Sequence, residues 1–191
     1  MALKAQAKIF ISPGLHYSIQ GDSKPTYTFN SSSTETLKNK LSGYGGTLKL
    51  GLSTSVIDIG LLYSRNLVKT ENETCPTNWT TICESNNASK WQSRTGAFIG
   101  FHLPINLSLG FVYAIPIGIK NDIGFSAAAV QLGYSINNFI KLVLSYHIGI
   151  TKWYDSDGNL SDLPKMVDTG LSLDKVEINS LIVGIEFPIG F

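Results

Sequence analysis

The end of the chain alternates between apolar side chains and side chains that are mostly small or polar. The apolar positions are Leu181, Val183, Ile185, Phe187, Ile189 and Phe191. Most of the positions between them are Ser180, Gly184, Glu186 and Gly190. A repeat of two residues is typical of a β-strand with two unlike faces, because successive side chains of a strand point to opposite sides. The stretch therefore predicts a strand that ends on an aromatic residue.

Seven earlier segments share this alternation. The expected strands are 8–20, 44–52, 57–66, 91–103, 107–119, 125–134, 140–150 and 180–191. The connections after the first, third and seventh strands are long and polar, near 21–43, 69–89 and 154–174, whereas the others are short. The pattern predicts an all-β fold, an eight-stranded antiparallel up-and-down barrel with an even number of strands. Both termini then lie at the end with the short turns.

Length and charge limit the class of protein. A chain of 191 residues suits one domain, which we expect to span residues 8–191. Residues 1–7 are expected to be an N-terminal tail, a remnant of a signal peptide or of cloning. The net charge of +1 gives no attraction to nucleic acid. No run of about 18 apolar residues predicts a transmembrane helix.

The composition decides which face of the barrel points outward. A soluble barrel would bury the apolar face and turn the other face to water. That other face is rich in Gly, Ser and Ala, and only 15% of all residues are charged, compared with about 25% in soluble domains. Aromatic residues are expected in two belts at the strand ends, as at membrane interfaces. Their members are Tyr17, Tyr44 and Trp91 at the loop end, and Phe101, Tyr134, Phe187 and Phe191 at the turn end. The sequence thus favours a transmembrane barrel.

The whole pattern resembles the small eight-stranded bacterial outer-membrane barrels of the OmpA, OmpX and opacity-protein type. The resemblance implies an integral Gram-negative outer-membrane protein with short periplasmic turns, longer extracellular loops and both termini in the periplasm. Its implied partners are outer-membrane lipid, including lipopolysaccharide, and the barrel-assembly machinery, with Phe187 and Phe191 as the assembly signal. It implies no cofactor and no nucleic-acid partner. The fold hosts surface antigens, porin-like pores and lipid-modifying enzymes, so it does not fix an activity.

The inward face carries a few charges, for which we expect a paired network because a buried ion needs a partner. The network comprises Lys8, Lys49, Asp58, Arg94, Lys141 and Glu186. Adjacent strands suggest the pairs Lys49–Asp58 and Glu186 with Lys141 or Lys8, and they leave Arg94 without an obvious partner. We expect a polar plug that stabilises the barrel.

The remaining motifs are weak. Cys75 and Cys83 share one polar loop, which predicts a disulfide in a secreted protein rather than a zinc site. His16-x-Ser18 is similar to the pair used by outer-membrane lipid A deacylases, and Ser145-x-His147 repeats the spacing in reverse. Neither pair has an assignable acid, so no catalytic residue is predicted.

One loop has the spacing of a calcium site. Asp155, Asp157 and Asn159 match the first three oxygen ligands of a calcium loop, but Leu160 and Met166 occupy positions that need Gly and Glu. No metal is therefore expected.

These observations favour a non-enzymatic surface barrel that presents extracellular loops to a protein partner, a host surface or a membrane complex. An outer-leaflet lipid A or phospholipid enzyme, and a small pore or conduit for hydrophobic compounds, stay open as alternatives.

Overall fold

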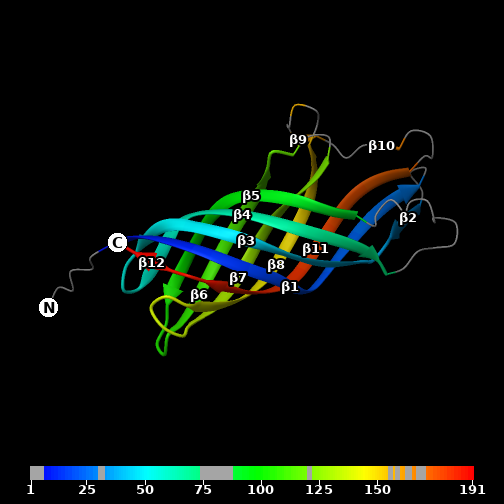
Figure 1. The fold of residues 1–191 in the computed structure, drawn as a ribbon. Coiled ribbons are helices and arrows are strands. Elements are labelled where there is room, and N and C mark those ends of the chain that lie inside the picture. Colours follow the sequence, from blue (N-terminus) through cyan, green and yellow to red (C-terminus); the bar gives the residue numbers. More distant parts are fainter. Residues whose placement is uncertain are drawn as a thin grey trace.

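Eight long antiparallel strands close into a barrel in the computed structural model (Figure 1). The structure describes residues 7–29, 33–73, 88–119, 122–154, 157, 160–161, 165–166 and 171–191. The barrel strands are β1 (Lys8–Phe29), β3 (Asn39–Ser53), β4 (Ile57–Asn72), β5 (Ala88–His102), β6 (Leu107–Ile117), β7 (Asp122–Ser135), β8 (Lys141–Tyr154) and β11 (Leu171–Glu186). Short strands are β2 (Ser33–Thr36), β9 (Leu160–Ser161), β10 (Lys165–Met166) and β12 (Ile189–Gly190). The predicted up-and-down barrel is confirmed. Among the described residues, no helix is long and apolar enough to cross a bilayer.

The C-terminal segment closes the sheet against the first strand. β1 pairs with β11 from Gly14↔Glu186 onward, and β12 continues the same register with Phe10↔Gly190. Pro188 has no N–H to donate, but pairing with β1 continues on both sides of it. The Phe187 amide donates to the Pro13 carbonyl and the Phe191 amide to the Ile9 carbonyl, each at 2.8 Å. Closure leaves neither the first nor the last strand as an open edge, as a bilayer requires because it offers backbone groups no water.

The outward face of the barrel is an apolar belt. Exposed apolar side chains occur on every barrel strand, for example Leu15 at 68%, Leu61 at 66% and Ile148 at 56%, and a contiguous apolar surface of this extent is not found on soluble monomers. Tyr17 and Tyr44 are cross-strand partners near one rim, and the Tyr44 ring meets that of Trp91 edge-on at 6.1 Å. The belt is therefore the lipid-facing surface expected from the alternation.

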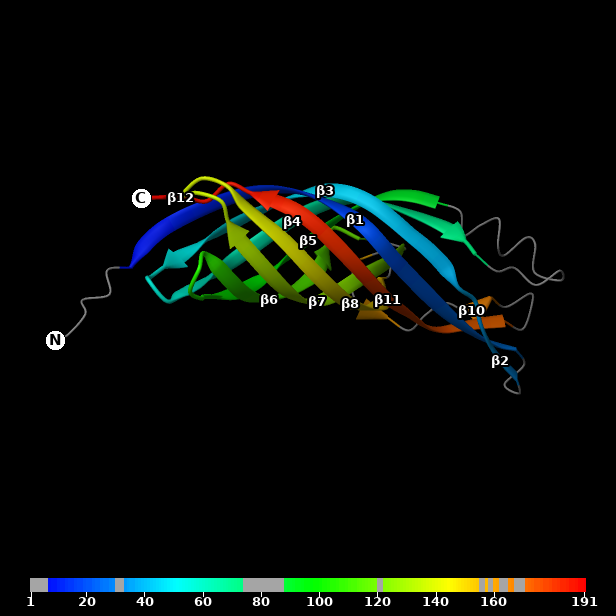
Figure 2. The same cartoon turned by 90° about the horizontal axis from the view of Figure 1, so that it is seen from below.

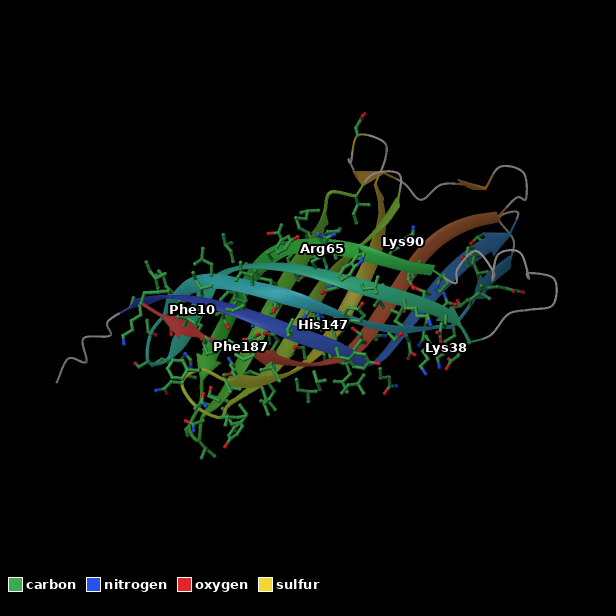
Figure 3. All side chains as sticks on the ribbon, in the orientation of Figure 1. Phe10, Lys38, Arg65, Lys90, His147 and Phe187 are labelled. Atoms are coloured by element: carbon green, nitrogen blue, oxygen red, sulfur yellow. The ribbon has the colours of Figure 1, made fainter. Side chains whose placement is uncertain are left out.

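Three short turns lie at the same end as the C-terminus (Figures 1 and 2). In the turn before β4, the Thr54 hydroxyl accepts from the Ile57 amide at 3.0 Å. The turn before β6 uses positive φ at Ile105 and Asn106, and the turn before β8 is held by the Asn137 side chain. We call this the turn end and the opposite end the loop end. Figure 3 shows Phe10 and Phe187 toward the turn end, and Lys38 and Lys90 toward the loop end.

The strands continue well past the belt at the loop end, where the sequence predicts a loop at 21–43. β1 runs on to Phe29, and β3 already begins at Asn39. The alternation breaks because both neighbours of β1 shift register between Ser18 and Asp22. This β-bulge reverses which side chains face inward, so that a continuing strand no longer matches the pattern before it. The expectation of an irregular loop there is wrong.

Candidate functional site

The interior of the barrel holds two ionised or polar layers, which together form the first candidate site. Small and polar side chains face inward along most strands and are buried, including Ser12 at 2% exposure and Ser145 at 3%. In an eight-stranded barrel such side chains nearly fill the lumen. The spaces left between them are cavities of about 50, 70 and 130 Å³, each large enough for only a few water molecules.

The layer nearer the turn end is built on a buried ion pair between Lys49 and Glu186. Lys49 Nζ lies 2.5 Å from Glu186 Oε1 and also donates to Gln131 Oε1 at 2.9 Å. The ammonium sits 5.3 Å from the centroid of the Phe98 ring, which packs edge-on against Phe10. Side chains from five strands, β1, β3, β5, β7 and β11, therefore meet at one level and fill the lumen.

This pair corrects the partners expected from strand adjacency. β3 and β11 are not neighbours, because β1 lies between them. Lys49 aligns with Ser12 and Glu186 with Gly14, and these two small residues let the long side chains meet across β1. Asp58, the expected partner of Lys49, instead contacts His102 Nε2 at 2.9 Å.

Of the two partners expected for Glu186, Lys141 lies on the neighbouring strand at the same level and Lys8 lies away from it. Lys141 is its register partner on β8 and lines the same cavity, near the turn end. Lys8 is exposed and lies six residues along β1 from Gly14, the partner of Glu186. At about 3.3 Å per residue that separation is too large for contact, so the expected pair of Lys8 with Glu186 is wrong.

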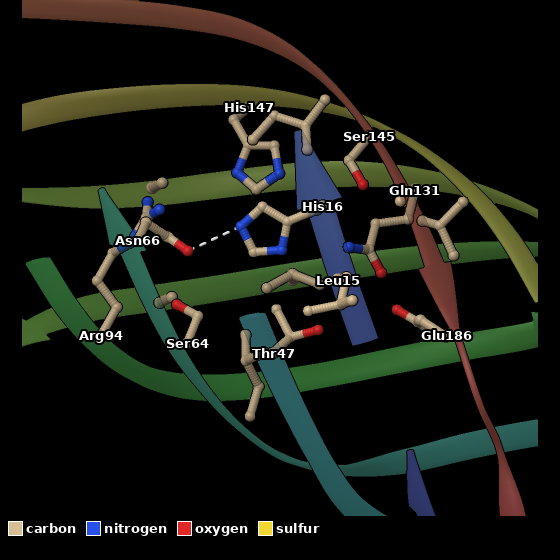
Figure 4. Close-up of a pocket in the computed structure, with 17 residues that line it drawn as sticks. Leu15, His16, Thr47, Ser64, Asn66, Arg94, Gln131, Ser145, His147 and Glu186 are labelled. Carbon is tan, nitrogen blue, oxygen red and sulfur yellow. Dashed lines mark hydrogen bonds between the residues drawn. The ribbon is translucent and has the colours of Figure 1, made fainter. Parts of the chain in front are cut away.

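A second layer lies deeper in the lumen, toward the loop end, and centres on Asn66. A dashed line in Figure 4 marks the 2.7 Å contact between His16 Nε2 and the Asn66 amide. The amide orientation that satisfies every neighbour has Asn66 donating to His16 Nε2 and to the Arg65 carbonyl. Its oxygen then accepts from Arg94 Nη2, at 2.5 Å. Strand adjacency gave Arg94 no partner, and Asn66 was not predicted, because its only signal in the sequence is an inward position on β4.

The two serine–histidine pairs do not form catalytic dyads. His16, Ser145 and His147 line one cavity, but within the described part of the chain no serine hydroxyl is hydrogen-bonded to an imidazole. A serine nucleophile needs such a base within reach. His16 is bonded to the Asn66 amide, and Ser18 Oγ is buried without a partner.

Among the described residues, no group of three or more His, Cys, Asp or Glu side chains could hold a metal ion. Cys75, Cys83, Asp155 and Asn159 lie outside the described residues.

The second candidate site is the sheet that projects beyond the belt at the loop end (Figure 2). It consists of the outer parts of β1, β3, β4, β5 and β11 together with β2. Its inward side chains form a small core of Leu41, Val176 and Ile178, against which Val68 packs. The projecting sheet is therefore held by its own apolar contacts.

Ion pairs bind the outer rim of the projecting sheet. Lys38 Nζ lies 2.7 Å from Glu73 Oε2, and Lys69 pairs with Glu71 on the same strand. The hydrogen bond from Lys38 lowers the pKa of the Glu73 carboxyl and raises the pKa of the Lys38 ammonium. These exposed pairs give the rim a polar, mixed-charge surface.

Comparisons with known proteins give likeness at the level of three-dimensional structure. The sequence matches no protein-family model and no curated protein. Neisserial surface protein A is similar with 11% identity and a TM-score of 0.41, over 95% of this chain and 98% of that chain. The outer membrane protein OprG from Pseudomonas aeruginosa is similar with 9% identity and a TM-score of 0.48, over 97% of each chain. The barrel described above rests on its own strand pairing.

Proposed function

We propose that the protein is a non-enzymatic outer-membrane surface barrel, and that its projecting sheet contacts a partner outside the cell. The observation that carries this is the continuation of strands beyond the apolar belt at one end only. β1 has 22 residues, whereas about 9 to 11 suffice for a tilted strand to cross the bilayer. The excess at the loop end forms structure with its own core rather than irregular loops.

The orientation in the membrane is part of the proposal. Bacterial outer-membrane barrels have short turns on the periplasmic side and longer connections outside. The turn end, with the C-terminus, would then face the periplasm, and the projecting sheet would face the medium. Recognition concentrates on such segments because the barrel holds them rigidly.

Site-specific labelling of intact cells tests the orientation. An azide-bearing amino acid replaces Glu35, an exposed residue of β2, or Ile105, an exposed residue of the turn before β6. A membrane-impermeant reagent should label the Glu35 site on intact cells, and the Ile105 site only after the outer membrane is permeabilised. Labelling at Ile105 alone on intact cells would reverse the orientation.

Photo-crosslinking tests the partner. A photoreactive residue at Glu35 or Lys24, both on the projecting sheet, should give a discrete crosslinked protein on living cells. The same residue at Leu61, in the middle of the belt, is the matched control and should crosslink to lipid alone. Identical products at all three positions would contradict a partner at the projecting sheet.

One observation favours a second candidate, a lateral conduit for small apolar compounds. The ladder between β6 and β7 stops at Ala114↔Ala127, although β7 stays paired with β8 as far as Asp122↔Tyr154. Near this level, the loop-side cavity is lined by Leu41, Ile178 and other apolar side chains. Vesicles that contain the protein should then accumulate an apolar dye faster than vesicles without it, and equal rates exclude the conduit.

A further inference from the structure

The charges inside the barrel do not balance in the part of the lumen near Arg94. Among the side chains whose placement the structure describes, the inward-facing ionised ones are the cations Lys49, Arg94 and Lys141 and the carboxylates Asp58 and Glu186. Both carboxylates line the cavity nearest the turn end, together with both lysines. Arg94 does not line that cavity, and within the described residues it has no carboxylate partner.

Arg94 is also poor in hydrogen bonds. Its guanidinium donates from Nη2 to the Asn66 amide oxygen, while Nε is buried and has no partner. A guanidinium carries five N–H donors and stays charged, so a single neutral acceptor leaves most of its capacity unused. Glu186 is the described carboxylate that lines a cavity together with Arg94, and it is already paired with Lys49. Buried ions without a counter-ion are costly, and no second carboxylate of the described residues lines either cavity at this level.

The surroundings of Arg94 could receive an anion. Arg94, His16 and His147 line both of the cavities that meet at this level, of about 50 and 70 Å³. Because Asn66 donates to His16 Nε2, the proton of a neutral His16 ring lies on Nδ1, which is then a donor. Ser18 Oγ, buried without a partner, lines the loop-side cavity as well. Figure 4 shows Glu186 on the opposite side of the cavity from Arg94.

We propose that the lumen binds one small monovalent oxyanion, of the carboxylate class, against Arg94. The planar fork of a guanidinium matches the two oxygens of a carboxylate, and one negative charge balances the one uncompensated cation. The size of the cavities limits the ligand to a few heavy atoms, as in formate or acetate. Leu41 and Ile178 from the core of the projecting sheet line the loop-side cavity of this site, but the anion site does not depend on the function proposed for that sheet.

The chain offers a direct probe, because Arg65 and Arg94 are its two arginines. Arg65 lies on the outward face with its guanidinium 5.4 Å from the centroid of the Trp91 ring, whereas Arg94 lies in the lumen. Full-length protein labelled with ¹⁵N-arginine and folded in detergent should therefore give two Nε–H signals. Arg94→Gln and Arg65→Gln each remove one signal and so assign both, and a heat-modifiable gel shift verifies that each variant is folded.

Titration with sodium acetate, at constant ionic strength with a bulky buffer anion, tests the site. The Arg94 signal should shift and saturate, while the Arg65 signal stays in place. Arg94→Gln should lose the acetate-dependent rise in thermal unfolding midpoint, and Arg65→Gln should retain it, because ligand that binds the folded state raises stability. Arg94→Lys keeps the charge without the fork, so its apparent affinity should fall on the order of tenfold.

Three results would overturn the proposal. Absence of a saturable Arg94 shift excludes an anion site, and parallel unsaturated shifts of both signals indicate charge screening alone. Chloride binding as tightly as acetate would overturn the oxyanion class.

Discussion

Lys49 and Glu186 form a buried ion pair across β1, with Nζ and Oε1 2.5 Å apart, although their strands are not neighbours. The pair joins β3, the second of the eight barrel strands, to β11, the last one, and therefore spans the seam at which the barrel closes. Removing one partner leaves the other charged and buried, which costs roughly 3–5 kcal/mol in known cases.

Lys49→Met should therefore lower the free energy of unfolding by roughly 3 kcal/mol, whereas the double variant Lys49→Met/Glu186→Met should lose much less than the two single changes combined. Urea unfolding in lipid vesicles measures both. Lys8→Met, at the exposed rim of the same end, is the control and should have little effect. Additive losses would show that the two side chains are not coupled.

Gly14 makes room for this pair, and Gly46 provides a matched comparison one strand away. A Cβ on Gly14 would lie 2.8 Å from Thr47 Oγ1 and 3.1 Å from Glu186 Cγ, whereas a Cβ on Gly46 would meet only the Gly14 carbonyl oxygen, at 3.5 Å. Gly14→Ala should cost about 1–3 kcal/mol by overpacking, and Gly46→Ala should be neutral or slightly stabilising. Equal effects in urea unfolding would contradict a packing role for Gly14.

The sequence was sufficient for the barrel because every strand carries its own alternation, and the eight expected strands all occur. It was insufficient for the ends of the strands at the loop end. The bulge after Ser18 reverses the alternation, and the residues beyond it are polar on their outward side. A polar strand in water and a polar loop have similar compositions, so periodicity could not separate them.

The sequence predicted which residues belong to the lumen site, but not which of them pair with each other. Inward positions follow from alternation, so Lys49, Asp58, Arg94 and Glu186 were found. Their pairing was not, because adjacency along the sheet was taken as the criterion, and in a barrel this narrow, side chains also meet across a strand of small residues. The contact of Arg94 with Asn66 depends on the rotation of an amide, for which a sequence has no pattern.

The turn before β6 contains a strained residue that can be relieved. Ile105 has a φ of 62° and is 82% exposed, and Asn106 follows with a φ of 60°. A β-branched residue is disfavoured in this left-handed region, whereas Asn tolerates it. Ile105→Asn should therefore raise the free energy of unfolding by about 1 kcal/mol in urea denaturation.

Ile136→Asn, in another short turn at the same end, is the control because Ile136 is not among the described residues with positive φ. An equal gain from both variants would mean that lost surface hydrophobicity, and not backbone strain, is responsible.

The rim of the projecting sheet should respond to acid through Glu73. The pKa of the Glu73 carboxyl is lowered in the folded state, mainly by the hydrogen bond from Lys38. The ion pair therefore stabilises the fold fully above the ordinary carboxyl pKa, and this stabilisation is lost as the pH falls through the lowered pKa. An NMR titration should place the Glu73 midpoint below that of an isolated Glu, and Lys38→Gln should raise it. An unchanged midpoint in Lys38→Gln would show that the pair is not formed in solution.

Phe191 should matter for assembly and not for the folded barrel. Its ring is 74% exposed on the lipid side, while its backbone amide donates to the Ile9 carbonyl at 2.8 Å and does not need the ring. If the ring belongs to the signal that the barrel-assembly machinery reads, Phe191→Ala should lower the amount of heat-modifiable protein in outer membranes several-fold. The same variant, refolded in detergent, should have a free energy of unfolding within about 0.5 kcal/mol of the wild type.

Phe139→Ala is the matched control, since Phe139 is 69% exposed at the same end but lies in the turn before β8. Equal losses of membrane protein in the two variants would assign the effect to missing lipid contact, and a large change in detergent stability would assign it to the fold.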